Sequence, residues 1–347
     1  MIGKPQTVLP DQCTCRKRCR RMLCMLHLLL LLVGLAILIA GGDLLVRGAG
    51  ALAGRLGVAP VVIGMTVVAF GTSTPELVVN LAAAIRGDSA IGFGNVVGSN
   101  IANVGLLLAI TALAYPLVIH RSIVTREIPM MLLASVAAVV LGLNSLTEDG
   151  ADRFTRGDGL MLLLLFGVFL YYTLSDALRQ RDSDAFFVAP TTAAKPGGAA
   201  PGVRLAALIV GGLLLLVGGG ELTVRGALGF AQAVGIPEVI VGLTLVAVGT
   251  SLPELATSII AARRGQTDMA VGNIVGSNIF NLLFIWGLTV TLAPTDLPAG
   301  GRIDLLVMTA FAAALLPMAL TQRKLSRLEG GLLVMGYGAY IAWLAMR

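Results

Sequence analysis

Long apolar runs separated by short polar stretches dominate the chain from residue 26 onward. Each run is long enough to cross a bilayer as a helix, which takes roughly 20 residues. The runs are continuous rather than alternating, which favours helices over a transmembrane β-barrel. The pattern predicts ten spans, at residues 26–42, 60–85, 94–115, 128–144, 158–175, 203–228, 238–262, 271–293, 303–320 and 330–346.

Composition supports the same fold class. Hydrophobic residues make up 56% of the 347 residues and charged residues only 13%, about half the charged share of a typical soluble protein. So few charges cannot cover the surface of a water-soluble particle of this size. We therefore predict an all-α, multi-pass protein that is embedded in a lipid bilayer.

Several function classes are excluded by residue counts. The two His and four Cys, with every Cys between positions 13 and 24, leave no cluster for zinc or an iron–sulfur centre. The net charge of +6 does not indicate nucleic-acid binding, because six of the 25 basic residues lie in the first 21 positions and the rest are scattered between apolar runs. We expect no cofactor, no nucleic-acid partner and no obligate protein partner.

The chain contains an internal repeat. Adding 178 to each position from Gly41 to Asn103 aligns that segment with residues 219–281 without a gap, and 32 of the 63 pairs are identical. Each half holds five predicted spans, an odd number, so the second copy must run through the membrane in the opposite sense. An inverted repeat of this kind builds an ion site at the bilayer midplane, between the two copies.

This repeat gives the expected domain organisation. The chain begins with a basic N-terminal extension at 1–25, followed by a first five-helix repeat at 26–175 whose motif region is 60–115. A cytoplasmic linker at 176–202 leads to a second five-helix repeat at 203–347, whose motif region is 238–293.

The first repeated motif places a carboxylate near the centre of a span. It reads Gly71-Thr-Ser-Thr-Pro-Glu76 in the first half and Gly249-Thr-Ser-Leu-Pro-Glu254 in the second. Pro75 lacks an N–H and its ring crowds the carbonyl four residues earlier, so we expect the helix to break there. A capping box, with Ser73 as N-cap and Glu76 three residues later, is the structural alternative. It does not explain a charge whose burial costs roughly 2.5–3.5 kcal/mol.

The second repeated motif is rich in amides and small residues. It runs from Gly94 to Asn103 and again from Gly272 to Asn281. Asn95, Ser99 and Asn103 are spaced four apart and so share one helical face. Helix packing through side-chain amides and glycines is the alternative to an ion-binding role.

Together the two motifs supply carboxylates, hydroxyls, amides and freed carbonyls, with no thiolate or imidazole. An all-oxygen set suits a hard cation. Two carboxylates balance one Ca²⁺, which accepts 6–8 flexible oxygen ligands, whereas Mg²⁺ requires a tight octahedron. Na⁺ can use the same oxygens at lower charge. The residues therefore predict broken helices around a midplane site in a secondary transporter for hard cations, Ca²⁺ among them.

At these motifs the chain resembles the calcium/cation antiporter superfamily, and most closely its bacterial and archaeal sodium/calcium exchangers. The resemblance covers about residues 26–347 and implies ten helices in two inverted halves, in a bacterial or archaeal inner (plasma) membrane. It also implies a set of ion ligands. These are Glu76 and Glu254 as central carboxylates, the carbonyls of Thr72, Thr250, Ala69 and Ala247, the hydroxyls of Ser73, Ser251, Ser99 and Ser277, and the amides of Asn103 and Asn281.

Asn281 departs from a common microbial pattern, in which an Asp occupies this position. The site therefore keeps two carboxylates instead of three. Since relatives that co-transport potassium use an acid here, the resemblance argues against potassium as a co-substrate.

We predict that the protein exchanges Ca²⁺ for Na⁺ by alternating access, without covalent chemistry. A Ca²⁺/H⁺ antiporter on the same scaffold is the nearest alternative. An intramembrane enzyme with Ser73 or Ser251 as nucleophile is disfavoured because neither aligned segment, 41–103 or 219–281, contains a His to act as base. A passive channel is disfavoured because opposed repeats with broken helices suit a closed, alternating site.

Charged residues outside the motifs bear on topology. Asp43 and Arg47 are spaced four apart, as are Glu221 and Arg225, so each pair predicts an intrahelical ion pair, with a gating contact as the alternative. After residue 21, the loops expected in the cytoplasm hold 13 Lys and Arg and the opposite side holds six, as the positive-inside rule requires. The basic extension opposes this orientation, so we expect the native chain to start at Met22 or Met25, with a genuine basic extension that the later helices overrule as the alternative.

Overall fold

The computed structural model describes residues 11–144, 151–187, 202–234 and 247–346. The first half of this fold contains α1 (Asp11–Leu56), α2 (Pro60–Ile63), η1 (Gly64–Val68), α3 (Ala69–Thr72), α4 (Thr74–Arg86), α5 (Ser89–Ala102), η2 (Asn103–Leu108), α6 (Ala109–Ala114), β1 (Leu117–Val118), η3 (Ile123–Glu127), α7 (Ile128–Gly142), β2 (Arg153–Phe154) and α8 (Arg156–Phe187). The second half contains α9 (Gly202–Val234), α11 (Ala247–Thr250), α12 (Leu252–Arg263), α13 (Thr267–Ile279), η6 (Phe280–Trp286), α14 (Gly287–Leu292), β3 (Thr295–Asp296), α15 (Gly301–Gln322), β4 (Lys324–Leu325) and α16 (Arg327–Met346). The η segments are π-helical.

The fold is that of a multi-pass membrane protein, as the apolar runs predicted. Within the described residues, eight helices are long and apolar enough to cross a membrane, and a bent helix pair raises the number to nine. The predicted span at 238–262 lies partly outside the described residues and begins, where it is described, with α11 and α12.

The first predicted span, 26–42, is too short. The helix α1 continues to Leu56, because Asp43 and Arg47 neutralise each other across one turn with an N–O distance of 2.7 Å and therefore do not end it. At the other boundary, α8 continues to Phe187, so the first part of the predicted linker at 176–202 is helical.

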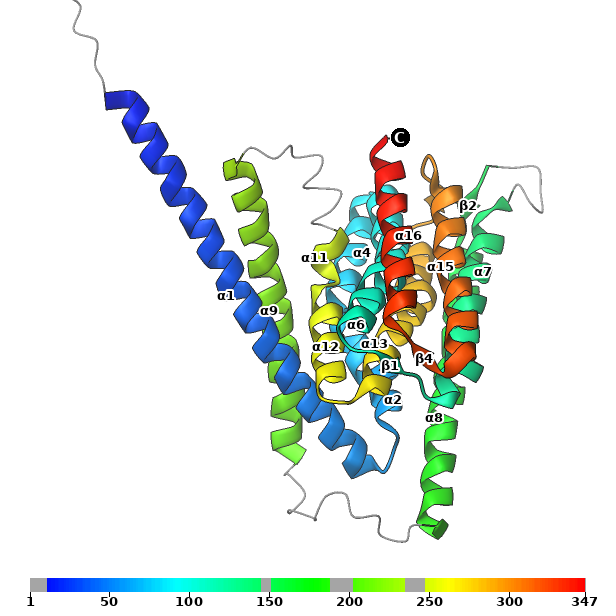
Figure 1. Cartoon of the computed structure of the whole chain (residues 1–347). Helices are drawn as coiled ribbons and strands as arrows, with labels where there is room; N and C mark the ends of the chain where they lie inside the picture. The colour runs from blue at the N-terminus through cyan, green and yellow to red at the C-terminus, as the bar shows by residue number, and fades with distance from the viewer. Residues whose placement is uncertain (1–10, 145–150, 188–201, 235–246, 347) are drawn as a thin grey trace, which may run out of the picture.

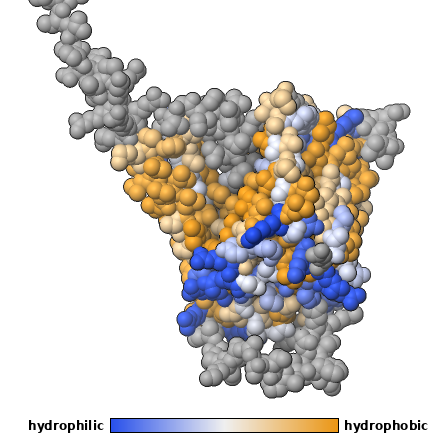
Figure 2. All heavy atoms as spheres, viewed as in Figure 1, coloured by the Kyte–Doolittle hydropathy of each residue, from blue (hydrophilic) through white to orange (hydrophobic). Residues whose placement is uncertain are grey.

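Two spans form the centre of the molecule. They run from Ala90 to Ala114 and from Thr267 to Leu292. In an apolar 18-residue stretch of each span, 78% and 83% of the residues are buried inside the protein. The pair α1 and α9 lies at one side of the molecule, and α7, α8 and α15 lie toward the other (Figure 1). Exposed apolar side chains cover the outer helices (Figure 2), as a lipid environment requires; among them are Leu29, Leu164, Leu214 and Met335.

Glycines let α1 and α9 approach within backbone contact. A Cβ atom on Gly41 would lie 2.7 Å from the backbone nitrogen of Leu216, and one on Gly212 would lie 2.7 Å from that of Leu45. Gly34 meets Gly219 in the same way. The contact positions run in opposite directions along the two helices, so α1 and α9 are antiparallel.

The helix that carries the first motif is broken. The segments Pro60–Thr72 and Thr74–Arg86 are bent by 46° at Ser73, whose φ and ψ are −84° and 9°. Pro75 lies in the first turn of the second segment, where its missing N–H costs nothing. The predicted break is therefore confirmed, and it brings Glu76 to the start of a half-helix.

Two short antiparallel ribbons connect the halves at their periphery. In one, Leu117 of β1 pairs with Leu325 of β4. In the other, Phe154 of β2 pairs with Thr295 of β3. Each ribbon joins one strand from before the long polar stretch to one from after it, so the two halves are interleaved rather than simply adjacent.

The glycine contact generates a stability prediction with a matched control. In Gly219→Ala, the new methyl group would lie 2.6 Å from the Leu38 nitrogen and 3.0 Å from the Gly34 oxygen, so we expect a loss of about 1–3 kcal/mol from overpacking. Gly218→Ala meets no atom within 4 Å and should gain about 0.5–1 kcal/mol of helix propensity. Thermal unfolding in detergent, followed by size-exclusion chromatography, should show a lower midpoint for the first variant only. Equal midpoints would contradict the close α1–α9 contact.

Candidate cation site

The two motif carboxylates are both deeply buried. Glu76 lies in the first turn of α4 and Glu254 in the first turn of α12, and each is only 1% exposed. In both cases the helix break places the carboxylate at the N-terminal end of a half-helix, where free N–H groups and the helix dipole favour negative charge.

Each carboxylate is held by the serine of the opposite motif. The Ser73 hydroxyl donates to Glu254 Oε1 at 2.9 Å, and the Ser251 hydroxyl donates to Glu76 Oε1 at 3.3 Å. Neither serine side chain forms a cap hydrogen bond with its own helix. The capping-box alternative is therefore wrong, because the serine side chains cross between the halves instead of closing their own helix ends.

The second motif is anchored to the first by amides. Asn95 Nδ2 donates to the Glu76 carbonyl at 3.3 Å, and Asn273 Nδ2 donates to the Glu254 carbonyl at 3.4 Å. The Thr72 hydroxyl also lies 3.3 Å from Asn273 Oδ1. Asn95 and Asn273 are not among the twelve predicted ligands, although the spacing predicted that Asn95 shares a helical face with Ser99.

A second set of amides crosses between α5 and α13. Asn103 Nδ2 donates to Asn278 Oδ1 at 2.9 Å, and Asn281 Nδ2 donates to Asn100 Oδ1 at 3.3 Å. Asn100 and Asn278 also reach each other's carbonyls, at 3.3 Å and 3.5 Å. The helix-packing role of this motif is therefore real, and Asn281 contributes an amide donor that an Asp could not supply.

Oxygen atoms without hydrogen-bond donors gather at these motifs. They belong to Glu76 (Oε2), Glu254 (Oε2), Ser99 (Oγ), Ser277 (Oγ), Thr250 (Oγ1), Asn103 (Oδ1) and Asn281 (Oδ1). An unpaired buried polar group costs about 1–3 kcal/mol, so a structure rarely keeps several together without a partner. A hard cation accepts oxygen ligands of this kind. In the described part of the chain, no three His, Cys, Asp or Glu side chains lie together so that they could hold a metal ion.

The remaining predicted ligands lie at the helix breaks. Thr72, Ser73 and Ala69 are fully buried, and the Ala69 carbonyl accepts the Ser73 N–H at 3.0 Å. Ala247 is the first residue of α11, at the edge of the described residues.

Two further polar residues are buried close to the motif carboxylates in the sequence. Asn80 and Thr257 are completely buried, and Asn80 Oδ1 and Nδ2 and Thr257 Oγ1 have no hydrogen-bond partner. Sequence reasoning missed both, but their spacing was a usable signal, since Asn80 follows Glu76 by four positions and Thr257 follows Glu254 by three.

Three π-helical segments border the site, and the sequence pattern did not predict them. The segment η1 ends at Val68, next to Ala69. The segment η2 begins at Asn103, and η6 contains Asn281. A π-turn rotates the following side chains relative to an α-helix and is frequent at functional sites.

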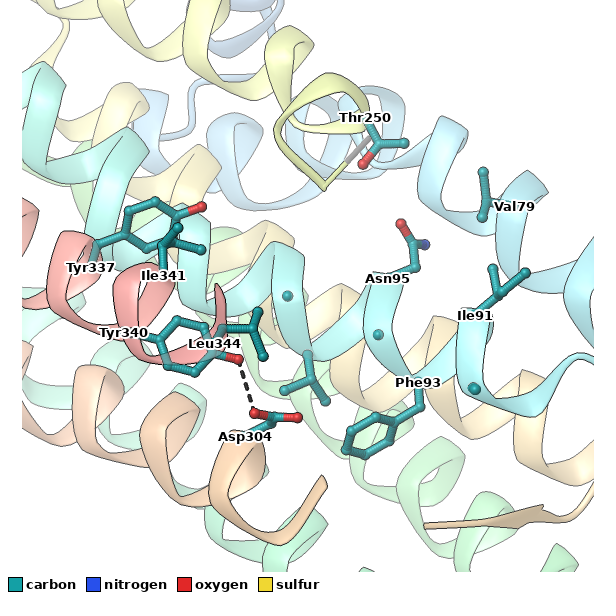
Figure 3. Close-up of a pocket in the computed structure, with 14 residues that line it drawn as sticks. Val79, Ile91, Phe93, Asn95, Thr250, Asp304, Tyr337, Tyr340, Ile341 and Leu344 are labelled. Carbon is teal, nitrogen blue, oxygen red and sulfur yellow. Dashed lines mark hydrogen bonds between the residues drawn. The ribbon is translucent and has the colours of Figure 1, made fainter. Parts of the chain in front are cut away.

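Two cavities reach the site from one side. The first, of about 410 Å³, is lined by Asn95, Thr250 and Tyr337 and by the hydrogen-bonded pair Asp304–Tyr340, whose oxygens are 3.0 Å apart (Figure 3). The second, of about 420 Å³, lies between α4 and α9 and also reaches Thr250. Thr72, which occupies the matching position in the first motif, is 0% exposed. The two motifs are therefore not equally accessible.

Comparison with known proteins shows the family of the chain. The sequence model of the family described as sodium/calcium exchanger protein matches residues 26–175 and 204–346. The chain is 36% identical over 293 residues to the inner membrane protein YrbG of Escherichia coli, covering 84% of this chain and 87% of that protein. It is 35% identical over 320 residues to the sodium/calcium exchanger MaX1 of Methanosarcina acetivorans, covering 84% and 91%.

A solved structure has the same fold. The sodium-calcium exchanger NCX_Mj, soaked with 10 mM Na⁺ and 10 mM Sr²⁺, superposes with a TM-score of 0.77 at 31% sequence identity, over 92% of this chain and 98% of that chain.

The unpartnered oxygens predict stabilisation by a hard cation. Ca²⁺ that binds only the folded protein, at 100 times its dissociation constant, adds about 2.7 kcal/mol to the free energy of unfolding. We therefore expect Ca²⁺ to raise the thermal midpoint of the purified protein over that in a chelator. Glu76→Gln should fold but lose this increment, whereas the remote variant Gly218→Ala should keep it. An equal Ca²⁺ shift in Glu76→Gln would place the cation elsewhere.

Proposed function

Because this chain belongs to the sodium/calcium exchanger protein family, whose members are membrane transporters and not enzymes, we propose that it exchanges Ca²⁺ for Na⁺ by alternating access. The observation that carries the proposal is the pair of reciprocal bonds Ser73–Glu254 and Ser251–Glu76. Each bond fixes one oxygen of a carboxylate and leaves the other without a protein donor. Two free carboxylate oxygens from opposite halves then bind one Ca²⁺ together.

Charge balance explains why the two ions are exchanged. Glu76 and Glu254 are each only 1% exposed, and a single uncompensated carboxylate at the bilayer centre costs roughly 2.5–3.5 kcal/mol. One Ca²⁺ or two monovalent ions neutralise the pair, but both sets together leave an excess of positive charge. The site therefore switches its opening from one side of the membrane to the other only when it holds either one Ca²⁺ or two monovalent ions. This requirement couples Ca²⁺ flow in one direction to Na⁺ flow in the other.

The other motif residues complete the ligand set in this proposal. The carbonyls of Thr72 and Thr250 and the hydroxyls of Ser73 and Ser251 join the carboxylates around Ca²⁺. Sodium sites on either side use the remaining donors, which are the Ala69 and Ala247 carbonyls, the Ser99 and Ser277 hydroxyls, and the neutral amides of Asn103 and Asn281.

We further infer that the molecule is built as two inverted repeats of five helices, at 26–175 and 203–347, joined by the linker 176–202. Support comes from the contacts themselves. A shift of 178 converts the bond from Asn95 to Glu76 into that from Asn273 to Glu254. The antiparallel α1–α9 pair is also symmetric under this shift. The shift turns Gly34 into Gly212 and Gly41 into Gly219, so the contact of Gly34 with Gly219 corresponds to that of Gly212 with Gly41.

Counter-ion identity is tested by Ca²⁺ uptake into everted vesicles, with sodium and pH gradients imposed separately. We expect an outward sodium gradient to drive Ca²⁺ uptake and a pH gradient alone to leave uptake near background. Glu254→Gln at matched abundance should lower uptake at least about tenfold, since losing a coordinating charge costs more than ~1.4 kcal/mol. Uptake driven by the pH gradient alone would establish the Ca²⁺/H⁺ alternative.

A second variant tests the neutral position in the second motif. In Asn281→Asp, a third carboxylate joins the site and the donor to Asn100 is lost. One more monovalent ion or proton is then needed for charge balance, so Ca²⁺ transport should depend more steeply on Na⁺ concentration or pH. Asn281→Ala removes the same donor without adding charge and should not steepen the dependence. Equal profiles for the two variants would show that Asn281 lies away from the transported ions.

A further inference from the structure

An ion pair joins α1 to the end of α12 on one side of the candidate site. Asp43 Oδ1 accepts a hydrogen bond from Arg264 Nε at 2.9 Å, and the Nη2 atom of Arg264 contacts the same oxygen. Asp43 Oδ2 pairs with Arg47 one turn along α1, at 2.7 Å. The sequence predicted the contact with Arg47, but the bridge to Arg264 connects two separate helices.

The internal repeat supplies a second copy of these charges. The shift of 178 converts Asp43 into Glu221, and it converts Arg264 into Arg86. The intrahelical part of this copy is formed, since Arg225 Nε lies 2.6 Å from Glu221 Oε1. The bridge between Glu221 and Arg86 is not formed. Within the described part of the chain, Arg86 forms no ion pair and Glu221 pairs only with Arg225.

Helix packing is also tighter around Asp43 than around Glu221. At Gly42, next to Asp43, a Cβ atom would lie 2.6 Å from the Ile260 side chain of α12. At Gly220, next to Glu221, the three nearest atoms would be one Leu38 carbon at 3.7 Å and two Pro253 carbons at 3.8 Å, so none of the three belongs to α4. Between α9 and α4 lies the cavity of about 420 Å³, which Glu221 itself lines. The helices are closed together at Asp43 and separated at Glu221.

We propose that these two sets are alternating latches, so that Asp43–Arg264 holds the site closed on the Arg264 side while the Glu221–Arg86 latch is open. In an inverted repeat, exchanging the conformations of the halves opens the first latch and closes the second, by bringing α9 onto α4. The inference rests on the proposed alternating access and adds the residues that set the balance between its two states. The side closed in this structure is the one that the Lys and Arg count predicts to be cytoplasmic.

The magnitude follows from exposure. The Asp43 and Arg264 side chains are 31% and 34% exposed, so solvent screens part of their attraction. A pair of this kind shifts a two-state population by roughly threefold to fivefold. The latch therefore biases the equilibrium without blocking the exchange.

Thiol labelling tests the proposal on the full chain. A reporter cysteine is introduced by Val79→Cys on the wall of the cavity between α4 and α9, in a background where Cys13, Cys15, Cys19 and Cys24 are replaced by Ser. The probe is a membrane-impermeant methanethiosulfonate, applied to purified protein in nanodiscs without an ion gradient. Asp43→Asn and Arg264→Gln should each lower the labelling rate roughly threefold to fivefold, because the cavity closes more often. The variants Glu221→Gln and Arg86→Gln, which affect the open latch, should leave the rate unchanged or raise it.

Rescue separates a latch from general damage. The double variant Asp43→Arg with Arg264→Asp restores opposite charges and should return the labelling rate toward that of the parent. Unchanged labelling in Asp43→Asn, or an equal decrease in all four single variants, would overturn the proposal. Because labelling involves no transported ion, the latch and the sodium coupling can fail independently of each other.

Discussion

Two negative charges held inside a membrane protein are the constraint on which the rest of this structure depends. Glu76 and Glu254 are each 1% exposed, and no Lys, Arg or His forms a salt bridge with either among the described residues. The Ser73 and Ser251 hydroxyls donate to the carboxylates but do not neutralise them, and the amides of Asn95 and Asn273 bind only the backbone carbonyls of the same two residues. In the proposed exchange, a transported cation supplies the balancing positive charge and needs room between the two carboxylates.

Helix breaks provide that room. An unbroken span would satisfy all its backbone groups internally and direct each Glu along a continuous helix surface. The 46° bend at Ser73 instead turns α4 away from its first segment, so the carboxylate and the serine hydroxyl point toward the other half. Because each serine donates across the interface, the candidate cation site needs residues from both halves.

Much of this arrangement follows from local sequence. The multi-pass helical fold, the break before Pro75 and the burial of both Glu residues are visible in periodicity, proline chemistry and the repeat. The hydrogen-bond partner of the Ser73 hydroxyl was not visible, because the local sequence equally matches a capping box. Only the approach of Glu254 in the folded protein decides that the hydroxyl bonds to Glu254 and not to its own helix. The π-helical segments at Asn103 and Asn281 were not visible either, because the apolar pattern of a span is the same for an α-turn and a π-turn.

The central claim is that one hard cation is shared by two carboxylates from opposite halves. Diffraction from crystals of this protein soaked in Ca²⁺, recorded where calcium scatters anomalously, tests it most directly. The account predicts one strong peak about 2.3–2.6 Å from a carboxylate oxygen of both Glu76 and Glu254, the range of Ca²⁺–oxygen bonds. A peak that contacts only one of these residues, or that lies in either cavity away from both, would contradict it.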